Sequence, residues 1–244
     1  MAIKKNILVV AAHPDDEVLG CGATMAKHVA EGDHVTLVLV ADGVTSRMYD
    51  PTHPMARRKE LSLNKQAISR RAKEAYHAAK VLGLGAKNVC LLNLADQRLD
   101  NYLLLDIVKH IEKIKRSIKP SVVYTHFWGD LNLDHQIVCR AVLTAFRPRP
   151  GEHHAEVLHF EIPESTYLSV PGMQRAFIPD HYVDVQKTFS LKLKALESYE
   201  SERRQYPDFR SIKFIEKLGK KRGQEFKIGL AEAFVRLPVL EYDP

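Results

Sequence analysis

The segment Ala12–Glu17 gathers residues that could do chemistry within a few positions of one another. His13 and Asp16 offer an imidazole nitrogen and a carboxylate oxygen, both of which zinc accepts as ligands. A proline-initiated turn lies between them, so both side chains can point into one cavity. Asp15 or Asp16 could instead cap the helix that follows, because carboxylates are favoured at helix N-termini. This segment alone leaves a metal site and a helix cap equally open.

A second polar segment, His126–His135, favours the metal site. It reads His-Phe-Trp-Gly-Asp-Leu-Asn-Leu-Asp-His and lies between a predicted strand and a predicted helix. Its last residue, His135, would reach the same sheet edge as His13. The side chains of His13, Asp16 and His135 then provide three ligands, and a catalytic zinc site keeps its fourth position open.

Strands and helices alternate over the part of the chain that must position these residues. Apolar runs and helix stop signals predict strands at 7–11, 35–41, 89–92 and 121–125, and helices at 18–31, up to 82–83, at 102–118 and at 135–146. This alternation is typical of a Rossmann-like α/β fold, a mostly parallel sheet with helices on both faces. Ligands of such sheets bind beyond the carboxyl ends of the strands, so the loops beginning at Ala12, Asp42 and His126 are expected to carry function.

The pattern loosens after Pro148. Strands are predicted at 157–162 and 182–185, a helix at 188–203 and a closing segment at 231–237. We therefore expect a single domain over residues 1–244. Its Rossmann-like core would span residues 1–147, and a small C-terminal α+β subdomain, residues 148–244, would complete the same globule.

The composition and charge are those of a globular protein and argue against nucleic-acid-binding, disulfide-rich and membrane-spanning classes. The chain has 244 residues, 45% of them hydrophobic and 27% charged, which is ordinary for a globular protein. The net charge is +6, but acidic residues are mixed into the basic clusters and no aromatic platform accompanies them, so we expect no nucleic-acid partner. Three widely spaced cysteines argue against a disulfide framework, and no apolar run approaches the roughly 18 residues of a membrane span. We expect a cytoplasmic protein. The sequence does not distinguish a monomer from a homo-oligomer.

The two polar segments resemble those of the PIG-L/LmbE-like family of N-acetyl-sugar deacetylases. The resemblance is carried by His-Pro-Asp-Asp-Glu after the first predicted strand and by the later Asp-His that opens a helix. Arg70–Glu74 and Ala231–Phe234 support it. It implies a Rossmann-like fold and a zinc-dependent hydrolase that removes the N-acetyl group from an N-acetylglucosamine-type amino sugar or its conjugate. The expected partner is therefore this small molecule.

The resemblance also implies roles for individual residues. His13, Asp16 and His135 would bind zinc, and Asp15 would act as general base. Two imidazoles and one carboxylate also suit ferrous iron, so another divalent metal could take the place of zinc. Hydrolysis by water would release acetate and a free amine without a covalent intermediate.

One position departs from the family pattern. Many members carry His-x-x-His where this chain reads Asn132-Leu133-Asp134-His135. Asn132 can donate a hydrogen bond to an oxyanion, but it cannot deliver a proton to the leaving amine. Asp15, once protonated, is the first alternative for that role and His126 the second. Asp134 is expected to orient a metal ligand.

Four residues are candidates for contact with the sugar. Arg70, on the long helix, could reach a hydroxyl or a phosphate, or it could remain solvated. Asp42 could touch substrate or serve as a turn residue. Trp128 could stack on a sugar face or anchor the core, and His126 lies in the same loop. The alternative function is a non-hydrolytic sugar- or nucleotide-binding Rossmann-like protein, although the first strand is not followed by Gly-x-Gly-x-x-Gly.

Overall fold

The computed structural model describes residues 4–48, 57–149, 152, 154–168 and 176–237, with the side chains of 48 and 57–64 excepted. The strands are β1 (Asn6–Ala11), β2 (His34–Ala41), β3 (Val89–Leu94), β4 (Val122–His126), β5 (Glu156–Phe160), β6 (His181–Asp184) and β7 (Ala231–Arg236). The α-helices are α1 (Asp16–Ala30), α2 (Arg57–Val81), α3 (Leu104–Ile118), α4 (Leu133–Ala145), α5 (Phe189–Glu197) and α6 (Ile212–Gln224).

The strands form one seven-stranded sheet in the order β3-β2-β1-β4-β5-β7-β6. The first five strands are parallel, with Val9 of β1 opposite Leu37 of β2 on one side and Tyr124 of β4 on the other. Strands β7 and β6 join antiparallel at the edge. The strand order reverses between β1 and β4, so the loops after these two strands diverge and leave a crevice for ligands.

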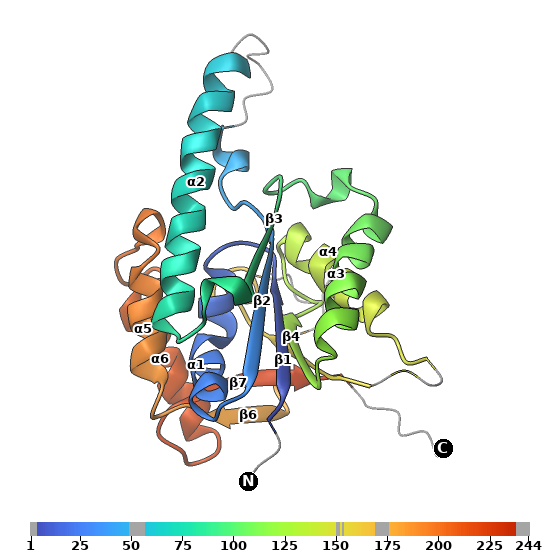
Figure 1. Ribbon diagram of the computed structural model, residues 1–244. Coiled ribbons are helices and arrows are strands. Elements are labelled where there is room, and N and C mark those ends of the chain that lie inside the picture. The colour runs from blue at the N-terminus through green and yellow to red at the C-terminus, as the bar shows by residue number, and fades with distance from the viewer. Residues whose placement is uncertain (1–3, 49–56, 150–151, 153, 169–175, 238–244) are drawn as a thin grey trace.

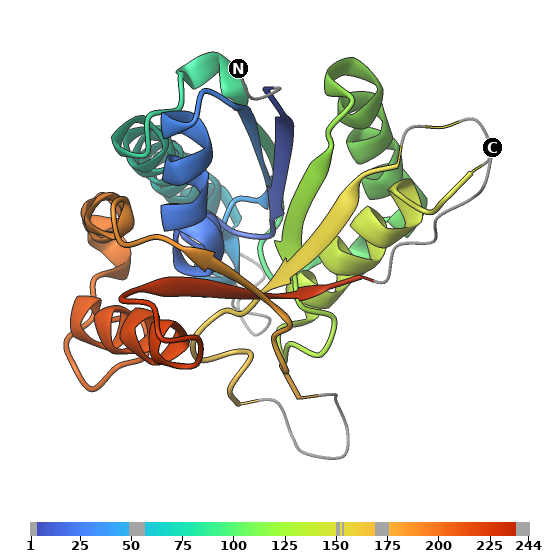
Figure 2. The ribbon, with the colours of Figure 1, turned by 90° about the horizontal axis from the view of Figure 1, so that it is seen from below.

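Helices cover both faces of the sheet, as Figures 1 and 2 show. Helices α1, α2, α5 and α6 pack on one face and α3 and α4 on the other. Alternate residues of β1 serve the two cores: Ile7 and Val9 face the first group, and Leu8 and Val10 the second. The continuous apolar run of β1 follows from this double burial. The predicted fold class is confirmed.

The C-terminal third extends the same sheet and core. Strand β5 pairs in parallel with β4, and residues of α5 and α6 share a hydrophobic core with α1. The predicted helix at 188–203 is too long. Helix α5 ends at Glu197 because Tyr199, with φ −85° and ψ 67°, leaves the helical conformation and buries its ring, with its hydroxyl on Glu17. A short 3₁₀ helix, Glu200–Glu202, follows. The division of the chain at residue 147 stays a prediction.

Helix α6 is absent from the sequence-based prediction. Ser211 marks its start, since the Ser211 hydroxyl accepts a hydrogen bond from the N–H of Phe214. Gly219 and Gly223 obscure the helical pattern, because glycine is a poor helix former. Packing explains Gly219: a Cβ atom there would lie 2.5 Å from the ring of Phe189.

Two further predictions concern the loop after β2 and membrane-spanning helices. The expected loop beginning at Asp42 contains a 3₁₀ helix, Thr45–Met48, and residues 49–56 lie outside the described part of the chain. Every helix in the described part of the chain is too short or too polar to cross a bilayer.

Candidate metal centre

The turn between β1 and α1 presents two aspartates in different ways. Asp15 has a φ of 115°, and its backbone oxygen accepts hydrogen bonds from the N–H groups of Val18 and Leu19. Its side chain makes no capping hydrogen bond. Asp16 is the first residue of α1, and its Oδ2 atom accepts a hydrogen bond of 2.9 Å from the N–H of His13. The interpretation of Asp15 as a side-chain helix cap therefore fails.

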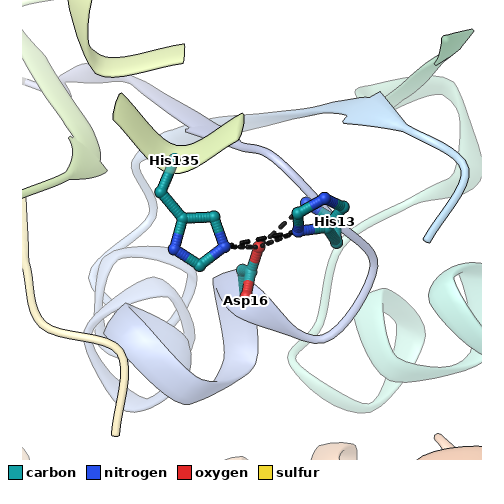
Figure 3. Close-up of side chains that lie close together, drawn as sticks. All are labelled: His13, Asp16 and His135. Carbon is teal, nitrogen blue, oxygen red and sulfur yellow. Dashed lines mark hydrogen bonds and ion pairs between the residues drawn. The ribbon is translucent and has the colours of Figure 1, made fainter. Parts of the chain in front are cut away.

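His13, Asp16 and His135 converge beside this turn (Figure 3). The Oδ2 atom of Asp16 lies 3.1 Å from Nδ1 of His13 and 3.2 Å from Nε2 of His135. These two ring nitrogens are 3.3 Å apart. All three side chains are buried. The structure thus brings the three predicted ligands together from the loop after β1 and from the first turns of α1 and α4.

The outward-facing nitrogens of both histidines contact carboxylates. Nε2 of His13 lies 3.0 Å from Asp134 Oδ2 and 3.1 Å from Asp96 Oδ1. Nδ1 of His135 lies 3.1 Å from Asp130 Oδ1. Histidines that bind metals usually donate their second ring nitrogen to a carboxylate or carbonyl, which fixes the orientation of the ring. The arrangement leaves Nδ1 of His13 and Nε2 of His135 to face the common centre.

The centre favours a positive charge. Burial disfavours protonation of His13, but its contacts with Asp134, Asp16 and Asp96 outweigh burial and raise its pKa well above the usual value. The second oxygen of Asp16, Oδ1, is buried and has no hydrogen-bond partner among the described residues. The Asp16 carboxylate therefore has one buried oxygen without a partner in the described part of the chain and the other, Oδ2, next to two imidazole nitrogens. A divalent cation would satisfy such a group, so the donor set fits a metal.

Asp15 lies next to this ligand set and is not part of it. Arg210, from the segment between α5 and α6, donates from its guanidinium to Asp15 Oδ2 at 3.0 Å and to Glu164 at 3.0 Å. Asp15 is 2% exposed. Burial raises the pKa of Asp15 to about 6, although Arg210 lowers it. The Asp15 carboxyl can therefore exchange a proton near neutral pH.

Asn132 and Asp134 connect the start of α4 to the site. The Oδ1 atom of Asn132 accepts a hydrogen bond of 2.9 Å from the N–H of Asp134 and so caps α4. Asp134 accepts hydrogen bonds from the N–H groups of Gln97 at 2.8 Å and Leu99 at 3.1 Å. These bonds fix the Asp134 carboxylate against His13. Because Oδ1 of Asn132 accepts the capping hydrogen bond, its Nδ2 group is the part of the side chain that can donate a hydrogen bond to a substrate.

Two of the residues predicted to contact sugar have local partners. Arg70 lies on α2 with 60% of its side chain exposed and donates to Glu74 at 3.3 Å. The structure does not bring it into the metal-ligand cluster. Asp42 is buried, and its Oδ1 atom accepts hydrogen bonds of 2.9 Å from the backbone N–H groups two and three residues later. This geometry is that of a turn residue.

The other two pack around the site. The ring of Trp128 is half-buried and packs edge-on against the ring of His159, with 4.8 Å between the ring centroids. His126 is fully buried, and its Nε2 atom accepts a hydrogen bond of 2.8 Å from the N–H of Ala12. Its ring stacks on the ring of His135, with 4.0 Å between the centroids. Contact of these residues with sugar stays a prediction.

Three residues of the site are not among those predicted from the sequence. Asp96 comes from the loop after β3, and an aspartate just beyond a strand end is the signal that points to it. Asp130 lies in the loop after β4, between the predicted residues Trp128 and Asn132. Arg210 is 195 residues from Asp15 along the chain, and no local pattern indicates that they meet.

Comparison with known proteins places the chain among deacetylases. The family described as "PIG-L: GlcNAc-PI de-N-acetylase" matches residues 8–146. The uncharacterized deacetylase YaiS of Escherichia coli (strain K12) is 30% identical over 204 residues, covering 81% of this chain and 92% of that protein. The diacetylchitobiose deacetylase of Thermococcus kodakarensis is 24% identical over 209 residues, covering 84% of this chain and 71% of that protein.

A solved structure shows the same fold with another activity. The 4-carboxy-2-hydroxymuconate hydratase GalB of Pseudomonas putida KT2440 superposes with a TM-score of 0.72 at 21% identity, over 98% of this chain and 99% of that one. Because GalB is a hydratase, the shared fold alone does not decide the reaction.

Proposed function

The chain belongs to the PIG-L family, and we propose on that basis that it hydrolyses the N-acetyl group of an N-acetylglucosamine-type amino sugar or its conjugate. The observation that carries this proposal is the buried set of His13, Asp16 and His135, with Asp15 beside it. Such a set serves a metal-dependent hydrolase. A non-hydrolytic sugar- or nucleotide-binding protein is not favoured, because the relatives named above are deacetylases.

Zinc is the proposed cation, held by His13, Asp16 and His135. When bound by these residues, a divalent cation would supply Lewis acidity, which would polarise the acetamide carbonyl and make water a stronger acid. Asp96, Asp130 and Asp134 would hold the two imidazoles in place. Elemental analysis of protein purified without oxygen would distinguish zinc from ferrous iron.

Asp15 moves the proton in the proposed reaction. Its Oδ1 atom takes a proton from the attacking water while Arg210 holds Oδ2. A new bond then forms between the water oxygen and the carbonyl carbon, and Asn132 Nδ2 donates a hydrogen bond to the oxyanion. The protonated Asp15 gives its proton to the nitrogen as the C–N bond breaks. The products are a free amine and acetic acid, which gives up its remaining proton to the solvent and leaves as acetate.

The relatives indicate an N-acetylglucosamine-type sugar as the substrate class. They differ in the group attached to that sugar, so this group is what the experiment must identify. The test is a panel of N-acetylglucosamine, N,N′-diacetylchitobiose, and N-acetylglucosamine linked to inositol or to malate. Each compound is incubated with zinc-loaded protein, and acetate and primary amine are measured together. Equal yields of both products from at least one compound are expected. Binding of these sugars without acetate release would support the non-hydrolytic alternative, and hydration of 4-carboxy-2-hydroxymuconate would support the GalB reaction.

A further inference from the structure

Helix α1 is broken soon after it begins. Cys21 has φ −144° and ψ 24°, outside the helical region, although helical residues precede and follow it. Sharp breaks in helices arise at proline, at glycine, at π-bulges, or where a side chain inserts into the ladder of backbone hydrogen bonds. Gly20 and Gly22 flank Cys21, and an inserted pair of side chains supplies a second cause.

The inserted side chains are Lys192 of α5 and Glu232 of β7. Glu232 accepts hydrogen bonds from the N–H of Ala23 at 3.2 Å and of Thr24 at 2.7 Å. Lys192 Nζ donates to the carbonyl oxygen of Leu19 at 2.8 Å and to Glu232 Oε1 at 2.6 Å. In an unbroken helix the N–H of Ala23 would donate to that same Leu19 carbonyl. The ion pair therefore replaces a helical hydrogen bond, with one charged group on each half of α1.

Both charged groups lie inside the protein. The exposed fraction is 3% for Lys192 and 4% for Glu232. Removing two charges from water costs much of what their attraction returns, so a buried ion pair is a weak source of stability. Because its bonds reach both halves of α1, the pair is instead suited to fixing the direction of one half relative to the other.

The half of α1 before the break carries the metal-binding aspartate. Asp16 is its first residue, and Gly20 at its end lies so close to Phe160 of β5 that a Cβ atom would be 2.3 Å from the ring. We propose that Lys192 and Glu232 are positioning residues of the metal centre, which direct the first turn of α1 so that Asp16 reaches both histidines. This inference rests on the proposed metal-dependent function of the site.

The test measures the zinc affinity of metal-free protein by competition with a chelator, without substrate. Lys192→Met and Glu232→Gln each leave one buried charge without its partner. We expect both to weaken zinc binding at least about tenfold, as loss of groups that orient metal ligands does. The double variant Lys192→Met/Glu232→Leu allows α1 to close its own hydrogen bond from Ala23 to Leu19. Its unfolding temperature should recover towards that of the wild type, while its zinc affinity stays low.

Glu161 and Arg222 provide a matched control. Their side chains form a buried ion pair at 2.8 Å and 2.7 Å in the same region, and these bonds reach no backbone atom of α1. Arg222→Met should lower the unfolding temperature as Lys192→Met does and leave zinc affinity unchanged.

Two outcomes would overturn this inference, and a third would overturn only the proposed function. Wild-type zinc affinity in the Lys192 and Glu232 variants would overturn the inference, and so would an affinity that simply follows the unfolding temperature through all variants. If Lys192→Met does not fold, Glu232→Gln and the double variant decide it by the same comparison. Wild-type protein that binds zinc but releases no acetate from any sugar would overturn the proposed function and leave this inference standing.

Discussion

The Nδ1 atom of His13 lies 3.3 Å from the Nε2 atom of His135, although the two residues are 122 positions apart in the sequence. Parallel strands explain this proximity. His13 follows β1, His135 follows β4, and the carboxyl ends of these paired strands meet at one edge of the sheet. Two imidazole nitrogens at this separation, both beside Asp16, form the centre on which the predictions depend.

Replacement of His135 by Ala should remove the metal. The wild type is expected to bind about one equivalent of zinc and His135→Ala none, since the remaining pair of ligands falls short of the usual three. Added zinc should raise the unfolding temperature of the wild type, because a ligand that binds only the native state stabilises it, and should leave that of the variant unchanged. His77→Ala, on the exposed surface of α2, is the control. Undiminished zinc content in His135→Ala would show that the metal lies elsewhere.

Replacement of Asp134 by Asn should weaken zinc binding without removing a ligand. Asn keeps the size of the side chain but loses the charge that faces Nε2 of His13 at 3.0 Å. Loss of such a partner typically costs 10- to 100-fold in metal affinity, so a fall of about that size is expected in chelator competition. Asp33→Asn is a matched control, because Asp33 pairs with His28 at 2.8 Å at the opposite end of α1. Equal losses in both variants would contradict a specific role for Asp134.

Replacement of Arg210 by Gln should change the pH dependence of activity. Burial raises the pKa of Asp15 to about 6, and the positive charge of Arg210 lowers it. Asp15 acts as a base only when deprotonated, so kcat/KM should fall as the pH decreases through this pKa. Without Arg210 the pKa of Asp15 rises, and the fall should begin at a higher pH.

Arg210→Lys is the control for this shift, because it keeps the positive charge. Its pH profile of kcat/KM should stay closer to that of the wild type. Identical acidic limbs in the wild type and in Arg210→Gln would rule out the proposed link between Arg210 and the base.

The sequence was sufficient for the parts of this protein that depend on local pattern. The apolar runs of the parallel strands and the polar residues just beyond β1 and β4 predicted the fold and brought His13, Asp16 and His135 to one edge. Arg210 could not be predicted in the same way, because its contact with Asp15 joins residues 195 positions apart and depends on where the segment between α5 and α6 lies in the folded protein. Helix α6 could not be predicted from local pattern, because Gly219 lowers the helix propensity of this segment. The glycine is there because the ring of Phe189 leaves no room for a Cβ atom.

Asn132→Ser separates two roles of one side chain. Ser is as good an N-cap residue as Asn, so the cap on α4 should survive and the free energy of unfolding should hardly change. Ser lacks the amide group that is proposed to donate to the oxyanion. Removal of one such donor costs about 10²- to 10³-fold in kcat, and a loss approaching that range is expected. Unchanged kcat in the Ser variant would leave Asn132 as a helix cap alone.

Asp15→Asn distinguishes a general base from a metal ligand. Asn is nearly isosteric with Asp and tolerates the φ of 115° at this position, so the turn into α1 should persist. It cannot accept a proton from water. If Asp15 is the base, the variant keeps zinc while kcat falls by about 10²- to 10⁴-fold. If Asp15 were a ligand, the same change would also lower zinc content. Zinc content and acetate release from one preparation decide between these outcomes, and near-normal turnover would leave the proposed mechanism without its base.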